Sequence, residues 1–181
     1  EQYVRDAKID TLYEGTTAIQ SQDLFFRKIV KDQGRALDDL STEIRQWVSA
    51  DGGNGQLKEE RGVLRQAVKD VWAIVATMIN DLGSCVPGRP GSDPRNVYKV
   101  GLNTTRLLMT LGDVICAWLL LRGAEVALDR LNEELSAAEK SFYEGKVASG
   151  RWFARTVLPK LTAERAIAEA TELAVMDLDE S

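Results

Sequence analysis

A carboxylate, a glycine and two threonines lie together near the start of the chain, in the segment LYEGTTAIQ at residues 12–20. Glu14 supplies a group that can accept a proton, and Thr16 and Thr17 supply hydroxyls where a helix is predicted to begin. The N–H groups at a helix N-terminus, with hydroxyls beside them, suit phosphate oxygens. Gly15 lets another group approach the main chain closely. A plain corner between two helices explains the same residues, so the segment alone leaves both readings open.

Composition limits the chemistry that the chain can perform by itself. The 181 residues are 44% hydrophobic and 28% charged, which is normal for one soluble domain with a substantial core. The formal net charge of −5 argues against a nucleic-acid surface, and most Lys and Arg residues alternate with acids as on solvated helix faces. The chain has no histidine, which excludes Ser-His-Asp and Cys-His catalysis within it and any zinc site that needs imidazole.

Cysteine usage and hydropathy indicate a cytoplasmic protein. Cys85 and Cys116 stand far apart beside apolar residues, and we expect two buried thiols rather than a disulfide. No signal peptide is evident, and no apolar run approaches the roughly 20 residues of a membrane span. The first residues, EQYVRDAKI, resemble the middle of a helix. We therefore expect the chain to be the C-terminal piece of a longer polypeptide.

Apolar residues recur at spacings of three and four, which predicts an all-α fold of four long helices with a fifth short one. The predicted apolar faces are Leu37, Leu40, Ile44, Trp47 and Val48; Leu64, Val68, Val71, Val75, Met78 and Leu82; Leu108, Leu111, Ile115, Trp118 and Leu119; and, less regularly, Phe142, Trp152, Phe153, Val157 and Leu161. Long helices packed against one another in a bundle are the simplest way to bury these faces.

Glycine and proline mark the predicted breaks between these helices. DGGNGQ at 51–56 ends the first long helix and PGRPGSDP at 87–94 ends the second. Asp93 followed by Pro94 is a cap and first residue for the third helix. A turn is expected within 131–149, and Pro159 should kink or end the last long element. We divide the chain at residue 50, into 1–50 with the chemistry-bearing segment and 51–181 as a further helical extension.

The run RDAKIDTLYEGTTAIQ at 5–20 resembles the C-terminal signature of acyl-CoA dehydrogenases, which reads Arg-Asp-Ala-Lys-Ile, then Tyr-Glu-Gly-Thr, then Ile-Gln. Eleven of its sixteen residues match in order and without gaps. The later run SFYEGKVASGRWFARTVLP at 141–159 is similar to the extra helical region that follows this signature in the larger bacterial members. The resemblance implies FAD-dependent α,β-dehydrogenation of acyl-CoA thioesters, as in fatty acid β-oxidation.

The resemblance also implies roles for individual residues. Glu14 takes the place of the base that removes the α-proton, while the β-hydrogen leaves as hydride to flavin N5. The backbone N–H of Glu14 takes the place of a donor that polarises the thioester carbonyl. Gly15 matches a position against the substrate. Thr16, Thr17 and Ala18 match positions that touch FAD, although Ala18 replaces a more usual polar residue and leaves only its backbone for that contact.

The remaining predictions concern partners. Arg27 and Lys28 are candidates for a CoA phosphate, against the alternative of solvated helix charges. Acyl-CoA, an electron-transfer flavoprotein as electron acceptor and the missing N-terminal part of the same polypeptide are the implied partners. We expect a homodimer or tetramer, with Trp118 or Trp152 near the seam. An alternative reading keeps the signature but assigns the chain a non-catalytic role as a helical assembly or dimerisation module.

Overall fold

The computed structural model describes residues 1–11, 16–50, 52, 55–88 and 91–177, and every regular element in them is a helix. The long elements are α3 (Arg35–Ser49), α4 (Lys58–Ser84), α5 (Asn96–Arg130), α6 (Ala137–Thr156) and α7 (Lys160–Glu169). The N-terminal elements are α1 (Gln2–Ala7), the 3₁₀ helix η1 (Lys8–Thr11), α2 (Thr17–Gln22) and the π-helix η2 (Asp23–Val30); a 3₁₀ turn, η4 (Ala174–Met176), follows α7. The predicted all-α class is confirmed.

The helix ends follow the local sequence signals with one shift. The helices α3 and α4 end just before the glycine-rich and proline-rich segments, and Pro159 separates α6 from α7, all as expected. The start of α5 was predicted two residues too early, because its first helical residue is Asn96. Asp93 still acts at this start: its Oδ1 accepts the N–H of Arg95 at 2.9 Å.

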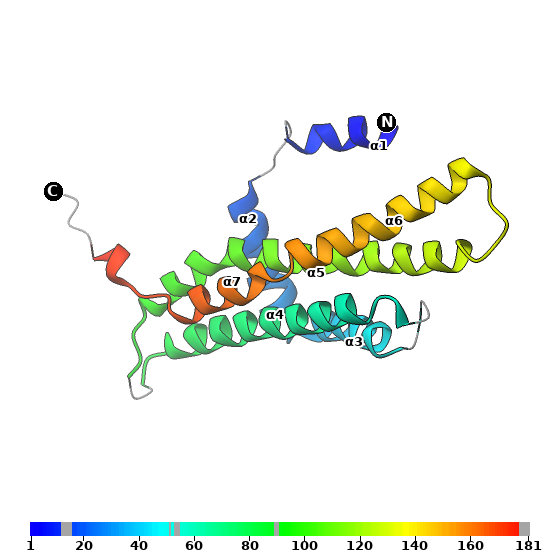
Figure 1. Ribbon diagram of the computed structural model, residues 1–181. Coiled ribbons are helices and arrows are strands. Elements are labelled where there is room, and N and C mark those ends of the chain that lie inside the picture. Colours follow the sequence, from blue (N-terminus) through cyan, green and yellow to red (C-terminus); the bar gives the residue numbers. More distant parts are fainter. Residues whose placement is uncertain (12–15, 51, 53–54, 89–90, 178–181) are drawn as a thin grey trace.

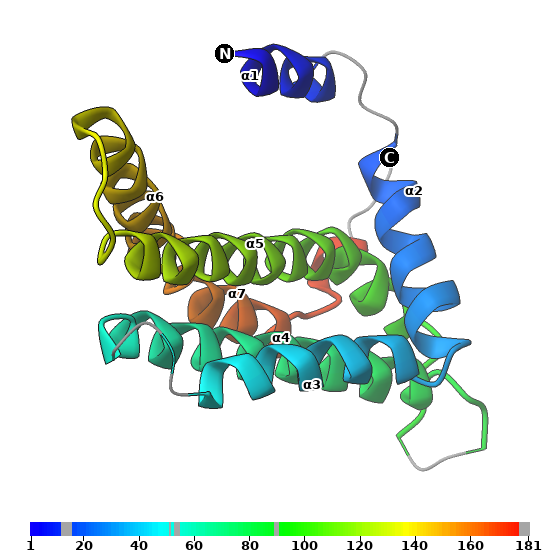
Figure 2. The same cartoon turned by 90° about the vertical axis from the view of Figure 1, so that its right-hand side faces the viewer.

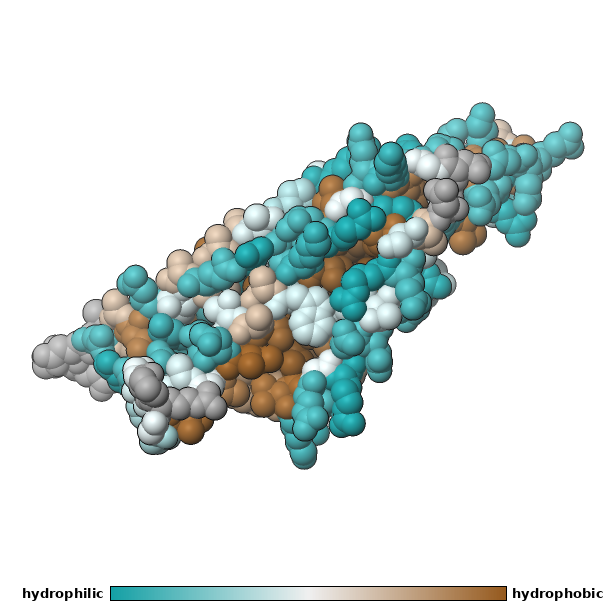
Figure 3. All heavy atoms as spheres, turned by 90° about the horizontal axis from the view of Figure 1, so that it is seen from below, coloured by the Kyte–Doolittle hydropathy of each residue, from teal (hydrophilic) through white to brown (hydrophobic). Residues whose placement is uncertain are grey.

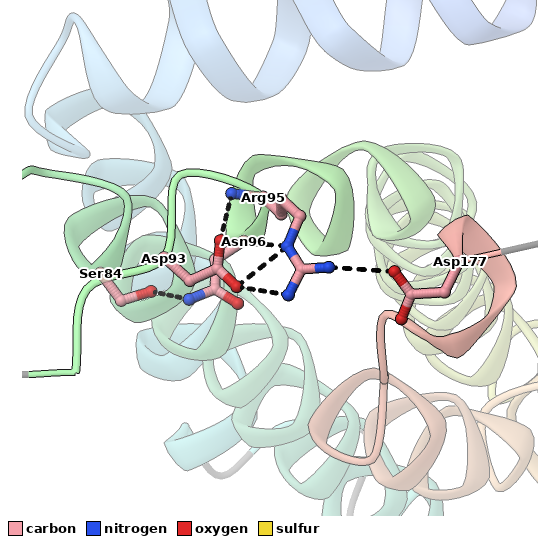
Figure 4. Close-up of polar contacts among 5 residues, drawn as sticks. All are labelled: Ser84, Asp93, Arg95, Asn96 and Asp177. Carbon is pink, nitrogen blue, oxygen red and sulfur yellow. Dashed lines mark hydrogen bonds and ion pairs between the residues drawn. The ribbon is translucent and has the colours of Figure 1, made fainter.

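The Arg95 side chain ties this helix start to the end of the chain. Its guanidinium bonds the Asp93 carboxylate and reaches Asp177 Oδ1 at 2.9 Å, while Asn96 donates to Ser84 Oγ at 2.8 Å (Figure 4). These polar contacts connect the end of α4, the start of α5 and the turn after α7. The contacts of Arg95 are exposed, so they orient the segments more than they stabilise the fold.

The bundle is built around α4 and α5, which lie one above the other (Figure 1). The helix α4 contacts α3, α5, α6 and α7, and α5 also packs against α2 and α6. In both views α3 and α4 lie on one side of α5, and α1 lies beyond its other side (Figure 2). The helix α1 is therefore separated from α3 and α4 by α5.

The apolar faces predicted for α3 and α4 are confirmed. Residues such as Ile44 and Met78 are almost inaccessible to solvent, and the other members of both stripes are buried or half-buried. The face predicted for α5 is confirmed except at Leu119: Trp118 is buried and Leu108, Leu111 and Ile115 are half-buried, whereas Leu119 is exposed. The prediction missed Leu107 and Leu121, which also belong to the core. This helix is apolar on most of its circumference, so the period of three and four does not say which side packs inward.

Small residues make the closest approach between α5 and α6, while Phe153 of the predicted face is half-buried against the core. Phe142 is exposed and Trp152 is 63% exposed, which corrects their expected place in an apolar face. The core residues of α6 include Gly150 and Ala154. A Cβ on Gly150 would lie 3.1 Å from Ala124 Cβ and 3.1 Å from the carbonyl oxygen of Leu120. The two backbones approach so closely that only glycine fits without displacement.

Buried charges on α4 hold the other helices in place, although charged residues were expected on solvated faces. Glu60 is fully buried and accepts Nε and Nη2 of Arg155 on α6 at 2.9 and 2.8 Å. Asp70 is also buried and accepts the Thr162 hydroxyl on α7 at 2.9 Å. Removing one partner of such a pair leaves an uncompensated charge in the interior.

A third buried charge, Arg61, joins three helices at once. Its guanidinium bonds Glu125 Oε1 on α5 at 2.5 Å and donates to the carbonyl of Ala50, just after α3, at 2.8 Å. It also donates to the carbonyl of Trp47 and lies 3.9 Å from the centre of that indole. The Trp47 N–H completes the cluster by donating to Glu125 Oε2 at 2.7 Å. Arg61 thus donates to two carbonyls at the C-terminal end of α3, where carbonyls lack partners from a next helical turn.

The expectation of two buried thiols was wrong. Both cysteines are free, but Cys116 is exposed on α5 and Cys85 is only half-buried. Desolvation, together with the carboxylates of Asp81 and Asp93, raises the pKa of the Cys85 thiol. The absence of a disulfide between them agrees with the prediction.

The helix α5 is long and apolar enough to cross a membrane, judged by length and composition alone. Its most apolar window has a mean hydropathy of 1.6, and 39% of that window is buried inside the bundle. A count of uninterrupted apolar residues missed it, because threonine and glycine interrupt the run. Its contacts with α4, α6 and α7 are those of a helix in the core of a bundle, which meets the same criterion.

Candidate functional site

The predicted chemistry-bearing segment joins two exposed elements. Every residue of α1 is exposed, and its main contacts are with η1, which follows it directly. Residues 12–15, and with them Glu14 and Gly15, lie outside the described residues. The structure therefore describes the elements on both sides of the predicted base and begins again at Thr16.

Thr16 starts the helix that follows the segment, as the sequence predicts. It is the N-cap of α2, with φ −78° and ψ 94°, and its carbonyl accepts the N–H of Gln20 at 3.0 Å. Thr16 and Ala18 are exposed and Thr17 is half-buried. Among the described residues, the Thr16 side chain makes no capping hydrogen bond. Its hydroxyl therefore does not serve the helix start, and it is accessible to solvent.

A buried hydroxyl cluster fixes α2 on α5. Ser21 is fully buried, and its Oγ lies 2.8 Å from the Ala18 carbonyl, 3.1 Å from Thr104 Oγ1 and 3.3 Å from Thr105 Oγ1. Hydroxyls can pack this closely inside a core because each satisfies another. The contact holds the C-terminal end of α2 against the long helix α5. The sequence gives no signal that joins residue 21 to residue 104, so this cluster was missed.

Directly after Ser21 and Gln22, the α-helix α2 continues as the π-helix η2. From Asp23 to Val30 it is a π-helix, and the N–H of Gly34 bonds the carbonyl of Ile29 five residues earlier at 2.8 Å. Phe25 and Ile29 point from it into the core. A π-helix is rare and occurs often at functional sites. Here it continues the helix whose N-terminus carries the threonines.

Arg27 is already paired on the outer face of this π-helix. Its Nε lies 2.5 Å from Asp23 Oδ1, and Lys28 Nζ lies 3.8 Å from Asp23 Oδ2. The hydrogen bond from Arg27 holds the pKa of the Asp23 carboxyl below its usual value, and the pKa of Arg27 is raised in return. Any phosphate that bound Arg27 would compete with Asp23 for the guanidinium.

The candidate site is thus the exposed N-terminus of α2 with the Thr16 hydroxyl, and the segment that carries Glu14 precedes it in the sequence. Ser21, further along α2, fixes this helix on α5. This all-helical bundle and its motif define a C-terminal segment of the acyl-CoA dehydrogenase type. The model of the family described as "Acetyl-CoA dehydrogenase C-terminal like" matches residues 40–179. The chain belongs to this family.

Named relatives agree with this assignment. The chain is 48% identical over its whole length to the broad-specificity linear acyl-CoA dehydrogenase FadE5 of Mycobacterium tuberculosis, and it covers 29% of that protein. It is 29% identical over 169 residues, or 90% of the chain, to 3-methylmercaptopropionyl-CoA dehydrogenase of Ruegeria pomeroyi, covering 26% of it. It is 27% identical over 177 residues, or 97% of the chain, to a butyryl-CoA dehydrogenase of Syntrophomonas wolfei, covering 27% of it. The chain therefore spans less than a third of the length of these relatives.

Proposed function

We propose that this chain is the C-terminal part of an FAD-dependent acyl-CoA dehydrogenase, with Glu14 as the base that removes the α-proton of an acyl-CoA thioester. The single observation that carries the proposal is the Tyr-Glu-Gly-Thr segment directly before the exposed N-terminus of α2, in a chain of this family. The names of the relatives, all acyl-CoA dehydrogenases, support the same reaction type.

The residues at the start of α2 fit one edge of a flavin cofactor. The exposed Thr16 hydroxyl and the first N–H groups of the helix are donors, and FAD presents ring carbonyls and phosphate oxygens that accept hydrogen bonds. Bound FAD would supply the acceptor for the β-hydrogen, taken as hydride. We infer that Thr16, Thr17 and Ala18 hold that edge, the last through its backbone. The rest of the pocket would come from the part of the polypeptide that precedes this chain.

In this proposal the helical bundle fixes the position of the segment that carries the base, Glu14. A carboxylate that is removed from water gains basicity, because desolvation disfavours its charged form. A well-placed general base contributes roughly 10²–10⁴ in rate. That placement depends on α2, which the Ser21 cluster fixes against α5. Closure of the site against water would require the other domains.

Replacement of Glu14 by glutamine tests the proposal in the complete polypeptide that carries this chain. Glu14→Gln should retain FAD and the fold, yet slow flavin reduction by acyl-CoA at least about 10²-fold, because the amide cannot accept the α-proton. Stopped-flow bleaching of the flavin measures this step. A matched control is Glu172→Gln, an exposed glutamate near the other end of the chain. Bleaching at the wild-type rate in Glu14→Gln would favour the alternative, a non-catalytic assembly module.

A further inference from the structure

One face of α5 is apolar and uncovered along most of the helix. Its members recur at spacings of three, four and seven, and all are exposed; we call them the outer face of α5: Leu102, Met109, Gly112, Cys116, Leu119 and Val126. Met109 is 59% exposed and Val126 is 60% exposed. The most apolar window of this helix is only 39% buried, so the bundle covers less than half of it.

No charged residue of α5 falls on this face. At about 100° per residue, the charged neighbours Arg106, Asp113 and Arg122 lie roughly 80–100° from its centre. Arg106 is paired with Glu164 on α7, and Arg122 lies over the ring of Trp118. On the side of the bundle away from α1, by contrast, apolar surface is bordered by hydrophilic side chains (Figure 3). An uncharged apolar face about 36 Å long is the kind of surface that marks an interaction site.

Glycines on the same side of α5 allow a close approach to its backbone. Gly101, Gly112 and Gly123 repeat every eleven residues, or about three turns. Nothing that the structure describes lies within 4 Å of a Cβ built on any of them. Glycine weakens the interior of a helix, and it suits positions where another group comes close to the main chain. Gly150 has this role inside the bundle, whereas Gly112 offers the same approach to something outside it.

The length of the relatives and the position of α1 favour the rest of the same polypeptide as the occupant. The chain covers 29% of FadE5, so roughly 440 residues of a protein of that length lie outside it. In both views α1 lies over the side of α5 that faces away from α4 (Figures 1 and 2). Tyr3 and Val4 of α1 are exposed, like the outer face. One body on this side of α5 would cover both apolar surfaces.

The outer face begins where α2 meets α5. Ser21 Oγ lies 3.3 Å from Thr105 Oγ1, between Leu102 and Met109 of the face. Thr16, the proposed FAD contact, lies roughly 7.5 Å from Ser21 along α2. A body of roughly 440 residues has a radius of gyration of about 22 Å, so it is wider than the face is long. Domains that complete a flavin pocket at Thr16 and cover α1 therefore reach over the outer face.

Other occupants fit this face less well. A flat bilayer would meet α1 and α2, which rise from α5 on this side, before it reached the middle of the face (Figures 1 and 2). A second copy of the chain, or a separate protein, would compete for the same space with the body that completes the flavin pocket. That body is joined covalently to this chain, so it does not pay the entropic cost of bringing two molecules together.

We propose that the outer face of α5 is the docking surface for the part of the same polypeptide that lies outside this chain, with the closest packing at Gly112. The inference rests on the proposed function, because it takes the chain to be the C-terminal part of a longer dehydrogenase. It does not depend on the role of Glu14. Flavin bleaching in Glu14→Gln tests the base alone, and the experiments below test the docking surface alone.

Cys116 reports directly on whether the face is covered in the complete polypeptide. Its thiol is exposed in this chain. In the complete polypeptide, alkylation by iodoacetamide, followed by mass spectrometry of the peptide that contains Cys116, should be at least about tenfold slower than in the urea-unfolded protein. The matched control is Asp39→Cys, an exposed position on α3, across the bundle from α1. Its thiol should react at close to the unfolded rate, and equal rates at the two thiols would overturn the proposal.

A photo-cross-link identifies what covers the face. With Met109 replaced by p-benzoylphenylalanine, irradiation of the purified complete polypeptide should give a product of single-chain mass on a denaturing gel. Mass spectrometry should link residue 109 to a peptide from outside this chain. A product of two-chain mass would assign the face to a second copy. No product, together with a reactive Cys116, would leave the face open to a separate protein or a membrane; either result overturns the proposal.

Two exposed glycines test the close packing at Gly112. In the complete polypeptide, Gly112→Leu should lower the melting temperature, because the added side chain meets the docked body. Gly145→Leu, on α6, should raise it, because leucine forms helix better and nothing lies within 4 Å of that Cβ position. Gly112→Ala should give a smaller loss than Gly112→Leu. A higher melting temperature in Gly112→Leu would mean that nothing packs against the centre of the face.

Discussion

Thr16 is the described residue nearest in sequence to Glu14, and its hydroxyl makes no capping hydrogen bond with the part of the chain that the structure describes. A threonine at an N-cap normally accepts an N–H of the first turn. Here the backbone of Thr16 starts the helix, while the side chain is exposed without a capping bond among the described residues. A hydroxyl that the fold does not use is available to a ligand.

Thr16→Ala separates the two roles. Because no capping bond is lost, the thermal transition of the complete polypeptide should stay unchanged. FAD should be held more weakly, by roughly 0.5–3 kcal/mol depending on whether the partner atom is neutral or charged. Equilibrium dialysis of FAD measures the loss, and Thr16→Ser should restore the binding. Unchanged affinity in Thr16→Ala would remove Thr16 from the proposed FAD contacts.

At the scale of elements, the closest packing in the bundle is the seam between α5 and α6. Gly150 brings the backbone of α6 against Leu120 and Ala124 of α5. Phe142 and Trp152, which the sequence placed in an apolar face, are exposed. Small residues allow a long contact between two straight helices, and the contact holds α6 over the bundle.

Two glycines of α6 provide a matched test of this seam. Gly150→Leu should lower the free energy of unfolding by about 1–3 kcal/mol or more, because the side chain meets Ala124 and the α5 backbone. Gly145→Leu should raise it by roughly 0.5–1 kcal/mol, because leucine forms helix better than glycine and nothing lies within 4 Å of its Cβ position. Urea unfolding followed by circular dichroism compares the two. Equal effects would mean that the seam adapts to a larger residue.

At the scale of the whole molecule, the core of the N-terminal segments is completed by the later helices. Phe25 and Ile29 of the π-helix and Ile44 of α3 are buried in one cluster with residues of α4 and α5. Neither part of our division at residue 50 buries its apolar face without the other. The proposed catalytic segment therefore depends on helices that carry no chemistry in this interpretation.

Truncation of the complete polypeptide after Asp51 should yield aggregation or loss of a dimer rather than an active monomer. The truncated protein would expose Phe25, Ile29 and Ile44, and apolar patches of this kind associate. We also predict that part of residues 57–173 lies at a homodimer seam, with Trp118 or Trp152 near it. Light scattering of the intact and truncated proteins measures both effects. A soluble, monodisperse and active truncation would contradict the prediction.

The sequence by itself determined the helical class, most helix ends and the place of the motif. The spacing of apolar residues and the positions of glycine and proline are local properties of the sequence. Pro159 and the glycine-rich segment after α3 therefore predicted the helix ends correctly. The same holds for the start of α2, because a threonine after a glycine is a local signal for an N-cap. The inward faces of α3 and α4 were also predictable, since each has one apolar stripe and one polar face.

Only the tertiary structure decided which apolar residues of α5 complete the core, which charges are buried and what holds α2. A helix that is apolar on most sides can pack in several rotations, and the choice depends on neighbours distant in sequence. Glu60, Arg61 and Asp70 resemble surface charges until α6, α5 and α7 cover them. The contact between Ser21 and Thr104 joins residues 83 positions apart. The sequence pattern within one helix cannot predict such pairs, because they form only when the packing of the whole bundle brings distant residues together.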